Sequence, residues 1–276
     1  MDVILQKLQK TLTFHSEDCL KHEYKSNGTV AIKPVQQLIV DGVVVCPRCE
    51  KEAEDNRVID KLVQRHENRN ESIFITKSLV SDKTILKARF DSYTRNVVEG
   101  SEEMKNKELA MHYANRLKNG EQFNIFLQGK AGTGKSHLSY SILAFLNEEM
   151  KNAACLFVEL SVMLREIRQS FSFKEHPYNE HYFVDLLSKV DFLVIDDLGA
   201  ETGATNTEKM ASDFVHRILK DVTNARQDKV TISTTNLSGK GLLSMYDAKT
   251  VSRLLKNPEY IMFKEATDKR VAKLPF

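Results

Sequence analysis

The chain has 276 residues, of which 41% are hydrophobic and 28% charged, an ordinary globular balance that lets most of it bury a core. A net charge of +2 does not by itself indicate a nucleic-acid or membrane partner, no stretch approaches the ~18 consecutive apolar residues of a membrane span, and the start "MDVILQKLQK" lacks the pattern of a signal peptide. Four unevenly spread cysteines exclude a disulfide framework and suit a reducing compartment, so we expect a cytoplasmic protein.

The N-terminal part of the chain reads as a small domain followed by a polar helix. Apolar residues at helical spacing predict a short helix over residues 3–14. The runs "TVAI" and "QLIVDGVVVC" read as strands, and the Asp-Gly pair in the second predicts a hairpin. Residues 51–72 are charged with a thin apolar stripe, which predicts a solvated helix. We therefore expect three parts: an N-terminal domain over 1–52, a helical linker over 53–75 and a larger domain over 76–276.

The larger domain reads as an α/β fold. A helical pattern over residues 106–120 ends at Gly120, which suits a helix C-cap. From residue 123 onward, the β-rich runs "FNIFLQ", "ACLFVEL", "DFLVID" and "VTISTTN" alternate with helical patterns at 136–150 and 207–226. Continuous apolar strands separated by helices predict a parallel sheet with helices on both faces.

The stretch "GKAGTGKS" fits the phosphate-loop pattern G-x-x-x-x-G-K-[ST], with a predicted strand before it and a helix after it. Its glycines let backbone N–H groups turn toward phosphates, and the helix N-terminus favours an anion. Lys135 would reach the β- and γ-phosphates, and Ser136 would ligate Mg²⁺. The alternative is an ordinary glycine-rich turn. The expected nucleotide-binding residues are Gly129, Lys130, Ala131, Gly132, Thr133, Gly134, Lys135, Ser136 and His137.

Polar residues end two later strands. Asp196 and Asp197 follow an apolar run, and two adjacent carboxylates facing water are costly unless a cation lies there. Asp196 would hold Mg²⁺ and Asp197 would polarise the attacking water, unless the strand simply ends in an acidic turn. Asn236, at the end of "VTISTTN", would orient that water, although Thr-Thr-Asn is also an ordinary strand exit. A second acidic residue favours ATP hydrolysis over a small-molecule kinase, and aspartate in place of the usual glutamate predicts slow turnover.

These residues carry a family resemblance over residues 73–276. The segments "GKAGTGKSHL", "VIDDLGAE", "TISTTNLS", "VSRLL" and "TDKR" resemble AAA+ ATPases of the helicase-loader type, the DnaC and DnaI group and its phage relatives. The resemblance implies an Mg·ATP core and makes Arg253 an arginine finger for a neighbouring subunit. Lys249 stands where the family commonly has a second arginine, which puts a two-arginine finger in doubt. Only 40 residues follow Asn236, so we expect no large helical lid and read "EYIMFK" as a last strand of the same sheet.

The N-terminal part of the chain holds two short-spaced pairs, Cys19-x₂-His22 and Cys46-x₂-Cys49, which suit a closed tetrahedral Zn²⁺ site of type Cys₃His. A domain of about 50 residues buries little core, so a metal has a stabilising purpose there. The alternatives are a stray Cys-Pro-Arg-Cys turn, a redox pair, or His15 in place of His22. Cys155 reads as an inert core thiol. The expected zinc ligands are Cys19, His22, Cys46 and Cys49. A zinc module ahead of the ATPase also resembles the Gram-positive and phage loaders, where it implies the part that grips the replicative helicase.

Residues 161–190 mix basic and aromatic side chains in a way that suits single-stranded DNA. In the family this region carries an added helical element that faces DNA. The alternative is a buried helix face formed by Leu164, Ile167 and Phe171, with surface loop around it. The candidate DNA-facing residues are Arg165, Arg168, Phe171, Phe173, Lys174, Tyr178 and Tyr182.

Three functions are compatible with these features. The first is a slow, switch-like ATPase that self-associates through its ATP sites and loads a hexameric helicase onto single-stranded DNA. The second is a transposition helper ATPase acting on duplex DNA, which the zinc module disfavours. The third is a nucleotide-binding adaptor without hydrolysis, which Asp197 and Asn236 disfavour.

Overall fold

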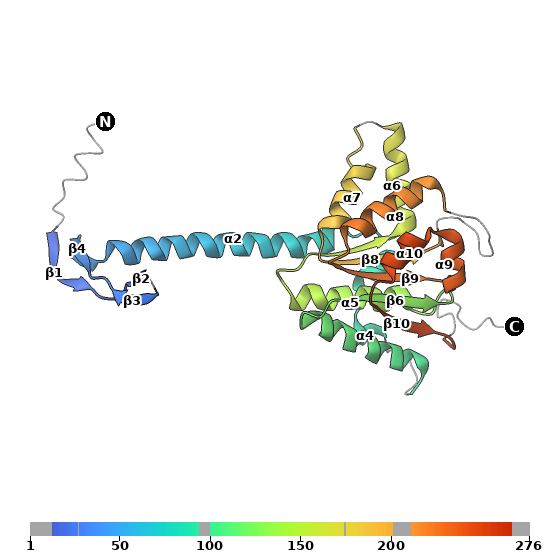
Figure 1. The fold of residues 1–276 in the computed structure, drawn as a ribbon, viewed down its shortest axis with the longest axis horizontal. Helices are drawn as coiled ribbons and strands as arrows, with labels where there is room; N and C mark the ends of the chain where they lie inside the picture. The colour runs from blue at the N-terminus through green and yellow to red at the C-terminus, as the bar shows by residue number, and fades with distance from the viewer. Residues whose placement is uncertain (1–12, 27, 94–99, 174, 201–210, 267–276) are drawn as a thin grey trace. The chain divides into compact units, whose positions relative to one another are not determined.

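The computed structural model describes residues 13–26, 28–93, 100–173, 175–200 and 211–266 (Figure 1). The chain divides into two compact units, residues 1–66 and 67–276. The helix expected over 3–14 lies outside the described residues as far as residue 12. The domain limits at residues 52 and 75 stay a prediction. None of the described helices is long and apolar enough to cross a membrane.

The first unit holds a small antiparallel sheet of β1 (Thr13–Cys19), β4 (Val35–Val40) and β5 (Val43–Val45) and a separate β2–β3 ribbon (Glu23–Ser26 and Thr29–Ile32). Asp41 and Gly42 link β4 to β5 with φ of 50° and 82°, as a tight hairpin turn requires, so the predicted hairpin is confirmed. The predicted N-terminal helix is wrong for its last two residues, because Thr13 and Phe14 pair with β4.

Helix α2 (Pro47–Lys77) follows β5 and is longer than the solvated helix predicted over 51–72. Proline suits the first helical position, where its missing N–H is not needed. The thin apolar stripe is exposed, with Val58 at 47% and Leu62 at 57%, so this stretch is solvated as predicted. The last turns of α2 belong to the second unit, where Phe74 is buried against Tyr140.

The second unit is built on a five-stranded parallel sheet, as predicted. Its strands, in sheet order, are β10 (Pro258–Phe263), β6 (Asn124–Gly129), β9 (Val230–Thr235), β8 (Phe192–Leu198) and β7 (Cys155–Glu159). Strand β10 contains most of "EYIMFK" and confirms that this segment joins the same sheet.

Both faces of this sheet are buried. Along β6, Ile125 and Leu127 pack with one set of helices and Phe126 with the other, because successive side chains of a strand point to opposite faces. One face carries α4 (Glu102–Lys118) and α5 (Lys135–Glu149). The other carries α6 (Leu160–Ser172), α7 (Glu180–Lys189), α8 (Asp213–Ala225), α9 (Gly239–Met245) and α10 (Ala248–Leu254) (Figure 1). The expected α/β core, a parallel sheet with helices on both faces, is confirmed.

Helix boundaries follow local caps. Helix α4 ends at a turn in which Gly120 has a φ of 92°, as its sequence predicted. Helix α8 begins at Asp213, later than the pattern over 207–226 suggested, with Ser212 at its N-cap; residues 207–210 lie outside the described residues. The sequence missed the short helices η1 (Lys83–Lys87) and α3 (Phe90–Tyr93).

Each outer strand of the sheet is covered by another segment. Beside β7, Leu79 donates its N–H to the carbonyl of Phe157 at 2.8 Å and accepts from the N–H of Glu159 at 2.9 Å. Beside β10, the Asn106 amide of α4 donates to the carbonyl of Met262 at 2.9 Å. The Glu102 carboxylate, at the start of α4, accepts from the three N–H groups that follow β10.

Candidate nucleotide site and metal centre

The phosphate loop lies between β6 and α5, as predicted: Gly129 is the last residue of the strand and Lys135 the first of the helix. Gly132 and Gly134 have φ of 74° and 98°, which side-chain-bearing residues rarely adopt. The loop therefore turns tightly into a helix N-terminus, where backbone N–H groups and the helix dipole favour an anion. The nucleotide contacts of residues 129–137 stay a prediction.

Tyr93 covers the loop, a contact that the sequence did not reveal. A Cβ at Gly134 would lie 2.7 Å from the Tyr93 ring, so only glycine fits there. The Tyr93 hydroxyl donates to the carbonyl of Thr133 at 3.5 Å. His137 packs its ring against Tyr93 with centroids 5.3 Å apart, and its Nε2 lies 3.0 Å from the carbonyl oxygen of Arg89. The segment before α4 thus helps to shape the phosphate loop.

Lys135, Asn236 and Asp197 form a continuous hydrogen-bonded chain. The buried Lys135 ammonium donates to the carbonyls of Gly129 and Lys130 and, at 2.7 Å, to Asn236 Oδ1. Asn236 Nδ2 donates in turn to Asp197 Oδ1 at 3.1 Å. The strands involved, β6, β9 and β8, are neighbours, and the carboxyl ends of parallel strands meet at one edge of the sheet. The structure therefore brings together three residues predicted to act in catalysis.

Asp196 and Asp197 lie at an irregularity in the sheet. The pairing of β8 with β9 shifts register between Ile195 and Leu198, and Asp197 has a φ of 61°. Such a bulge re-aims side chains near functional sites. The buried Asp196 accepts from the Thr234 hydroxyl at 2.6 Å and shares a hydrogen bond with Ser136.

Burial raises the pKa of Asp196 to about 6, although hydrogen bonds from Thr234 and Ser136 oppose the rise; the carboxylates of Asp197 and Glu159 add to it. A divalent cation beside Asp196 would offset these effects. The carboxylate of Asp196 and the hydroxyl of Ser136 are hard oxygen donors of the kind Mg²⁺ prefers. The two predicted ligands lie together and fit a magnesium ion.

Arg253 lies far from the phosphate loop of its own chain. Its carbonyl oxygen accepts from the Asn124 amide, at the start of β6, whereas the loop follows the end of that strand. Six residues of β-strand span roughly 17–20 Å, farther than an arginine side chain extends. Among the described residues, the buried Nη1 of Arg253 has no hydrogen-bond partner. Lys249 lies one turn earlier on the same helix.

The four predicted zinc ligands lie together in the first unit. Each residue offers one donor atom, and these four atoms all lie within 4.8 Å of one another. The group consists of Cys19, His22, Cys46 and Cys49. His22 is buried, with 3% of its surface exposed. His15 is half-buried and hydrogen-bonds to the backbone of Glu17, and it is not part of this cluster.

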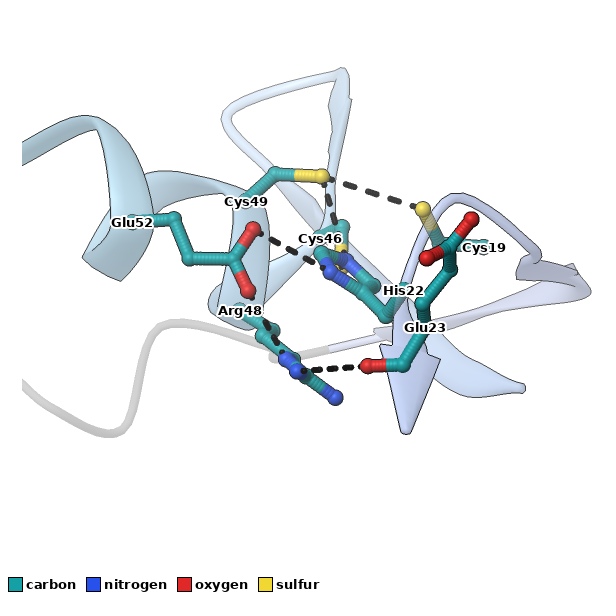
Figure 2. A network of polar contacts seen from close by, with 7 residues as sticks. All are labelled: Cys19, His22, Glu23, Cys46, Arg48, Cys49 and Glu52. Atoms are coloured by element: carbon teal, nitrogen blue, oxygen red, sulfur yellow. Dashed lines mark hydrogen bonds and ion pairs between the residues drawn. The ribbon is translucent and has the colours of Figure 1, made fainter. Parts of the chain in front are cut away.

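The spacing of the donor atoms suits a tetrahedral ion. The Sγ atoms of Cys19 and Cys49 are 3.7 Å apart, and His22 Nε2 lies 3.2 Å from Cys46 Sγ and 3.3 Å from Cys49 Sγ (Figure 2). Zinc bonds of ~2.3 Å to sulfur and ~2.0 Å to nitrogen place donors about 3.5–3.8 Å apart. Three thiols and an imidazole are a common structural zinc set, so the residues fit this metal.

The thiols of Cys46 and Cys49 differ in pKa. Against the effect of burial, hydrogen bonds from the Cys49 backbone and from His22 lower the pKa of Cys46 to about 7. Burial, with hydrogen bonding and charge repulsion from Cys19 and Cys46, raises the pKa of Cys49 to about 11. A Cys49 thiolate at neutral pH therefore requires a cation beside it. Cys155, by contrast, is a core thiol whose pKa is raised by burial, as predicted.

A polar network behind the cluster was missed by the sequence reading. Glu52 Oε2 lies 3.2 Å from Nδ1 of His22, the nitrogen that faces away from the thiols (Figure 2). Arg48 Nε donates to the other oxygen of Glu52 at 2.9 Å. The available signal was the spacing: Cys49 and Glu52 lie three residues apart in α2 and so share a helix face.

The basic and aromatic segment forms α6, α7 and their connection. Leu164 and Ile167 are buried, but Phe171 is 63% exposed, so the expected buried face of Leu164, Ile167 and Phe171 is wrong at its last member. Phe171 instead meets Phe214 of α8 edge to face, with centroids 5.6 Å apart. Arg168 lies over the same Phe214 ring at 5.9 Å. Arg165 and Phe173 are also exposed. The rings of Tyr178 and Tyr182 are in contact at a tilt of 59°, and Lys174 lies outside the described residues.

Comparison with known proteins agrees with this geometry. Residues 86–255 match the family model of the bacterial DnaA ATPase domain. A replicative helicase loader DnaC from Buchnera aphidicola (subsp. Acyrthosiphon pisum) is 27% identical over 149 residues, 52% of this chain and 57% of the relative. The crystal structure of the DnaC helicase loader has a TM-score of 0.52 at 19% identity, covering 66% of this chain and all of that one. The crystal structure of DnaI has a TM-score of 0.52 at 21% identity, and the match covers 68% of this chain and 96% of that one.

The residues that match the family model lie in the second unit. The chain spans about half the length of the curated relatives it matches. At these identities, the solved structures establish a common fold. The family model covers more than half of the chain and encloses the phosphate loop, Asp196, Asp197, Asn236 and Arg253. The chain therefore belongs to the family of bacterial DnaA ATPase domains.

Proposed function

We propose that this protein is a cytoplasmic, ATP-hydrolysing loader that delivers a replicative helicase to single-stranded DNA. The observation that carries the ATPase part is the hydrogen-bonded chain from Lys135 through Asn236 to Asp197, next to Asp196 and Ser136. This arrangement supports the proposal that a cation for phosphates, two magnesium ligands and a base act together at one edge of the sheet.

Each of these residues has a distinct task. The N–H groups of the phosphate loop and Lys135 bind the phosphates, while Ser136 and Asp196 hold Mg²⁺, which neutralises charge on the phosphates when bound. Asp197 accepts a proton from the attacking water, and Asn236, already bonded to Asp197, orients that water. Aspartate reaches less far than glutamate, so we expect slow turnover that rises on assembly.

Completion of the site requires a second copy of the chain. Arg253 lies near the start of β6, away from its own phosphate loop, and the residue as a whole is partly exposed. An arginine supplied by a neighbour can stabilise charge on the transferred phosphoryl group. The proposed ATPase is therefore active as an assembly.

The helicase and DNA parts rest on other observations. The curated relatives are named as replicative helicase loaders. The first unit, with its Cys₃His cluster taken to bind zinc, is the proposed grip on the helicase. Exposed Arg165, Arg168, Phe171 and Phe173 offer phosphate contacts and stacking surfaces for single-stranded DNA.

The test is phosphate release by the purified chain alone, with single-stranded DNA, and with DNA plus a replicative helicase that co-purifies with it. We expect hydrolysis to rise with each addition and the helicase to become DNA-bound only with ATP. Preference for duplex DNA and a transposase would support the transposition helper instead. ATP-dependent capture of the helicase without phosphate release would support the non-hydrolysing adaptor.

A further inference from the structure

The two ring nitrogens of His22 have different surroundings. Nε2 faces the thiols, 3.2 Å from Cys46 Sγ and 3.3 Å from Cys49 Sγ. Nδ1 faces away from them and lies 3.2 Å from Glu52 Oε2 (Figure 2). Since His22 is buried, these contacts rather than water set its tautomer and orientation.

The chemistry of the Glu52 contact selects one tautomer. A neutral imidazole carries one N–H, and a metal ligand needs its lone pair on the metal side. The carboxylate of Glu52 has no proton to give, so it accepts the proton of Nδ1 and leaves the Nε2 lone pair directed at the thiols. Metal-bound histidines commonly donate their second nitrogen to a carboxylate in this way.

Glu52 is itself held in place. Arg48 Nε donates to Glu52 Oε1 at 2.9 Å, one helical turn away on α2. The Arg48 guanidinium also approaches the carbonyl oxygen of Glu23, in β2, at 3.5 Å. The network thus ties the start of α2, which carries Cys49, to the segment that carries His22.

We propose that Glu52 is a positioning residue for zinc, fixing His22 with Nε2 toward the three sulfurs, and that Arg48 acts through Glu52. This inference rests on the zinc centre proposed above. The competing view is a surface ion pair between Arg48 and Glu52, because the Glu52 side chain is 50% exposed. A surface pair would leave the metal unaffected.

The first measurement is zinc release from the full chain to a chromogenic chelator, together with equilibrium competition for zinc. Glu52→Ala should release zinc faster and bind it about 10–100-fold more weakly. Glu54→Ala is the matched control, since Glu54 is an exposed carboxylate of α2 that pairs with Arg57 at 3.5 Å. It should behave as wild type.

The second measurement is the ¹⁵N NMR spectrum of the histidine rings in the zinc-loaded protein. The Nδ1–H of His22 should be protected from exchange in the wild type and exchange rapidly in Glu52→Ala. Glu52→Gln, which keeps an oxygen acceptor, should restore much of the protection. Adding Arg48→Ala to Glu52→Ala should change zinc release no further, because Arg48 acts through Glu52.

The outcomes separate the two proposals. A well-folded wild-type chain without zinc overturns the zinc centre itself. If the wild type binds zinc, and Glu52→Ala shows the same zinc release and the same exchange of the His22 Nδ1–H, the proposed role of Glu52 is overturned. If Glu52→Ala does not fold, Glu52→Gln decides: zinc release matching wild type while Nδ1–H protection is lost would contradict the proposal.

Discussion

Asp196 illustrates how a single functional residue can cost stability. Its pKa is raised to about 6, mainly by burial, above the ordinary value of 3.8. The ionised carboxylate therefore destabilises the folded state, and this cost is complete above pH 6, shrinks as the pH falls below 6 and is gone near pH 3.8. A pKa difference of about two units corresponds to roughly 2–3 kcal/mol.

We expect Asp196→Asn to be more stable than wild type when metal and nucleotide are absent. The gain at pH 8 should raise Tm by roughly 4–10 °C and should shrink below pH 6, where the wild-type carboxyl is protonated. Thermal unfolding in chelator at several pH values measures this. The same variant should lose magnesium-dependent hydrolysis. Equal Tm values for Asp196→Asn and wild type at pH 8 would contradict the cost assigned to the buried carboxylate.

The placement of Arg253 leads to a complementation test. Arg253→Ala should keep the ATP affinity and Tm of the single chain but lose most hydrolysis under assembly conditions. Lys135→Ala should not bind ATP, because the phosphate charge loses its partner in the loop. A mixture of the two inactive variants should recover part of the activity, since one supplies an intact loop and the other an intact arginine. Wild-type hydrolysis by Arg253→Ala alone would refute the arginine-finger assignment.

At the scale of secondary-structure elements, one buried arginine connects α7 and β9 at the end of the sheet opposite the phosphate loop. Arg226, after α8, donates to the carbonyls of Leu187 and Val190 near the end of α7 and of Val230 in β9, each at 2.6 Å. It also donates to the Thr231 hydroxyl at 3.1 Å. Burial lowers its pKa to about 10, so it stays charged at neutral pH.

Arg226→Met should therefore destabilise the second unit by about 2–4 kcal/mol, because several buried carbonyls lose their donor. Arg217→Ala, which removes an exposed pair with Glu180, is the control and should cost about 0–1 kcal/mol. Urea unfolding of both variants, monitored through the loss of nucleotide binding, compares their stabilities. Similar midpoints for both variants would show that the Arg226 contacts contribute little.

How far the sequence could predict each element depends on how local its determinants are. The phosphate loop could be predicted because its strand, glycines and Lys135 are contiguous. The contact of Tyr93 with Thr133 could not, because it joins residues 40 positions apart with no motif between them. Arg226 stands in the polar stretch "NARQD" and reads as a surface residue, since the carbonyls around it come from the end of α7 and from β9.

The same distinction holds for the metal centre. Short spacing within the Cys–His pair and the Cys–Cys pair predicted all four candidate zinc ligands, which the structure brings together. The spacing of Glu52 from Cys49 does not single it out, because a glutamate in a charged helix is ordinarily solvated. Only the position of His22 in three dimensions shows that this carboxylate has a partner.

At the scale of the whole molecule, the two units should respond differently to loss of metal. Structural zinc contributes about 10–16 kcal/mol in small zinc modules, more than a unit of this size gains from its own core. Chelation, or Cys46→Ser, should unfold the first unit while the second still binds nucleotide. Limited proteolysis with metal analysis tests this; Cys155→Ala should keep about one zinc per chain. Loss of nucleotide binding on chelation would contradict independent units.

The coverage of both outer strands limits how copies of this protein can associate. Exposed strand edges invite further strands, from partner peptides or from other copies, and so promote amyloid-like growth. Here Leu79 and its neighbours pair with β7, while side chains of α4 bond the backbone in and after β10. Among the described residues, backbone pairing that would extend the central sheet is thus hindered at both ends. We expect copies that associate through the second unit to meet through side-chain surfaces rather than through a continuous sheet.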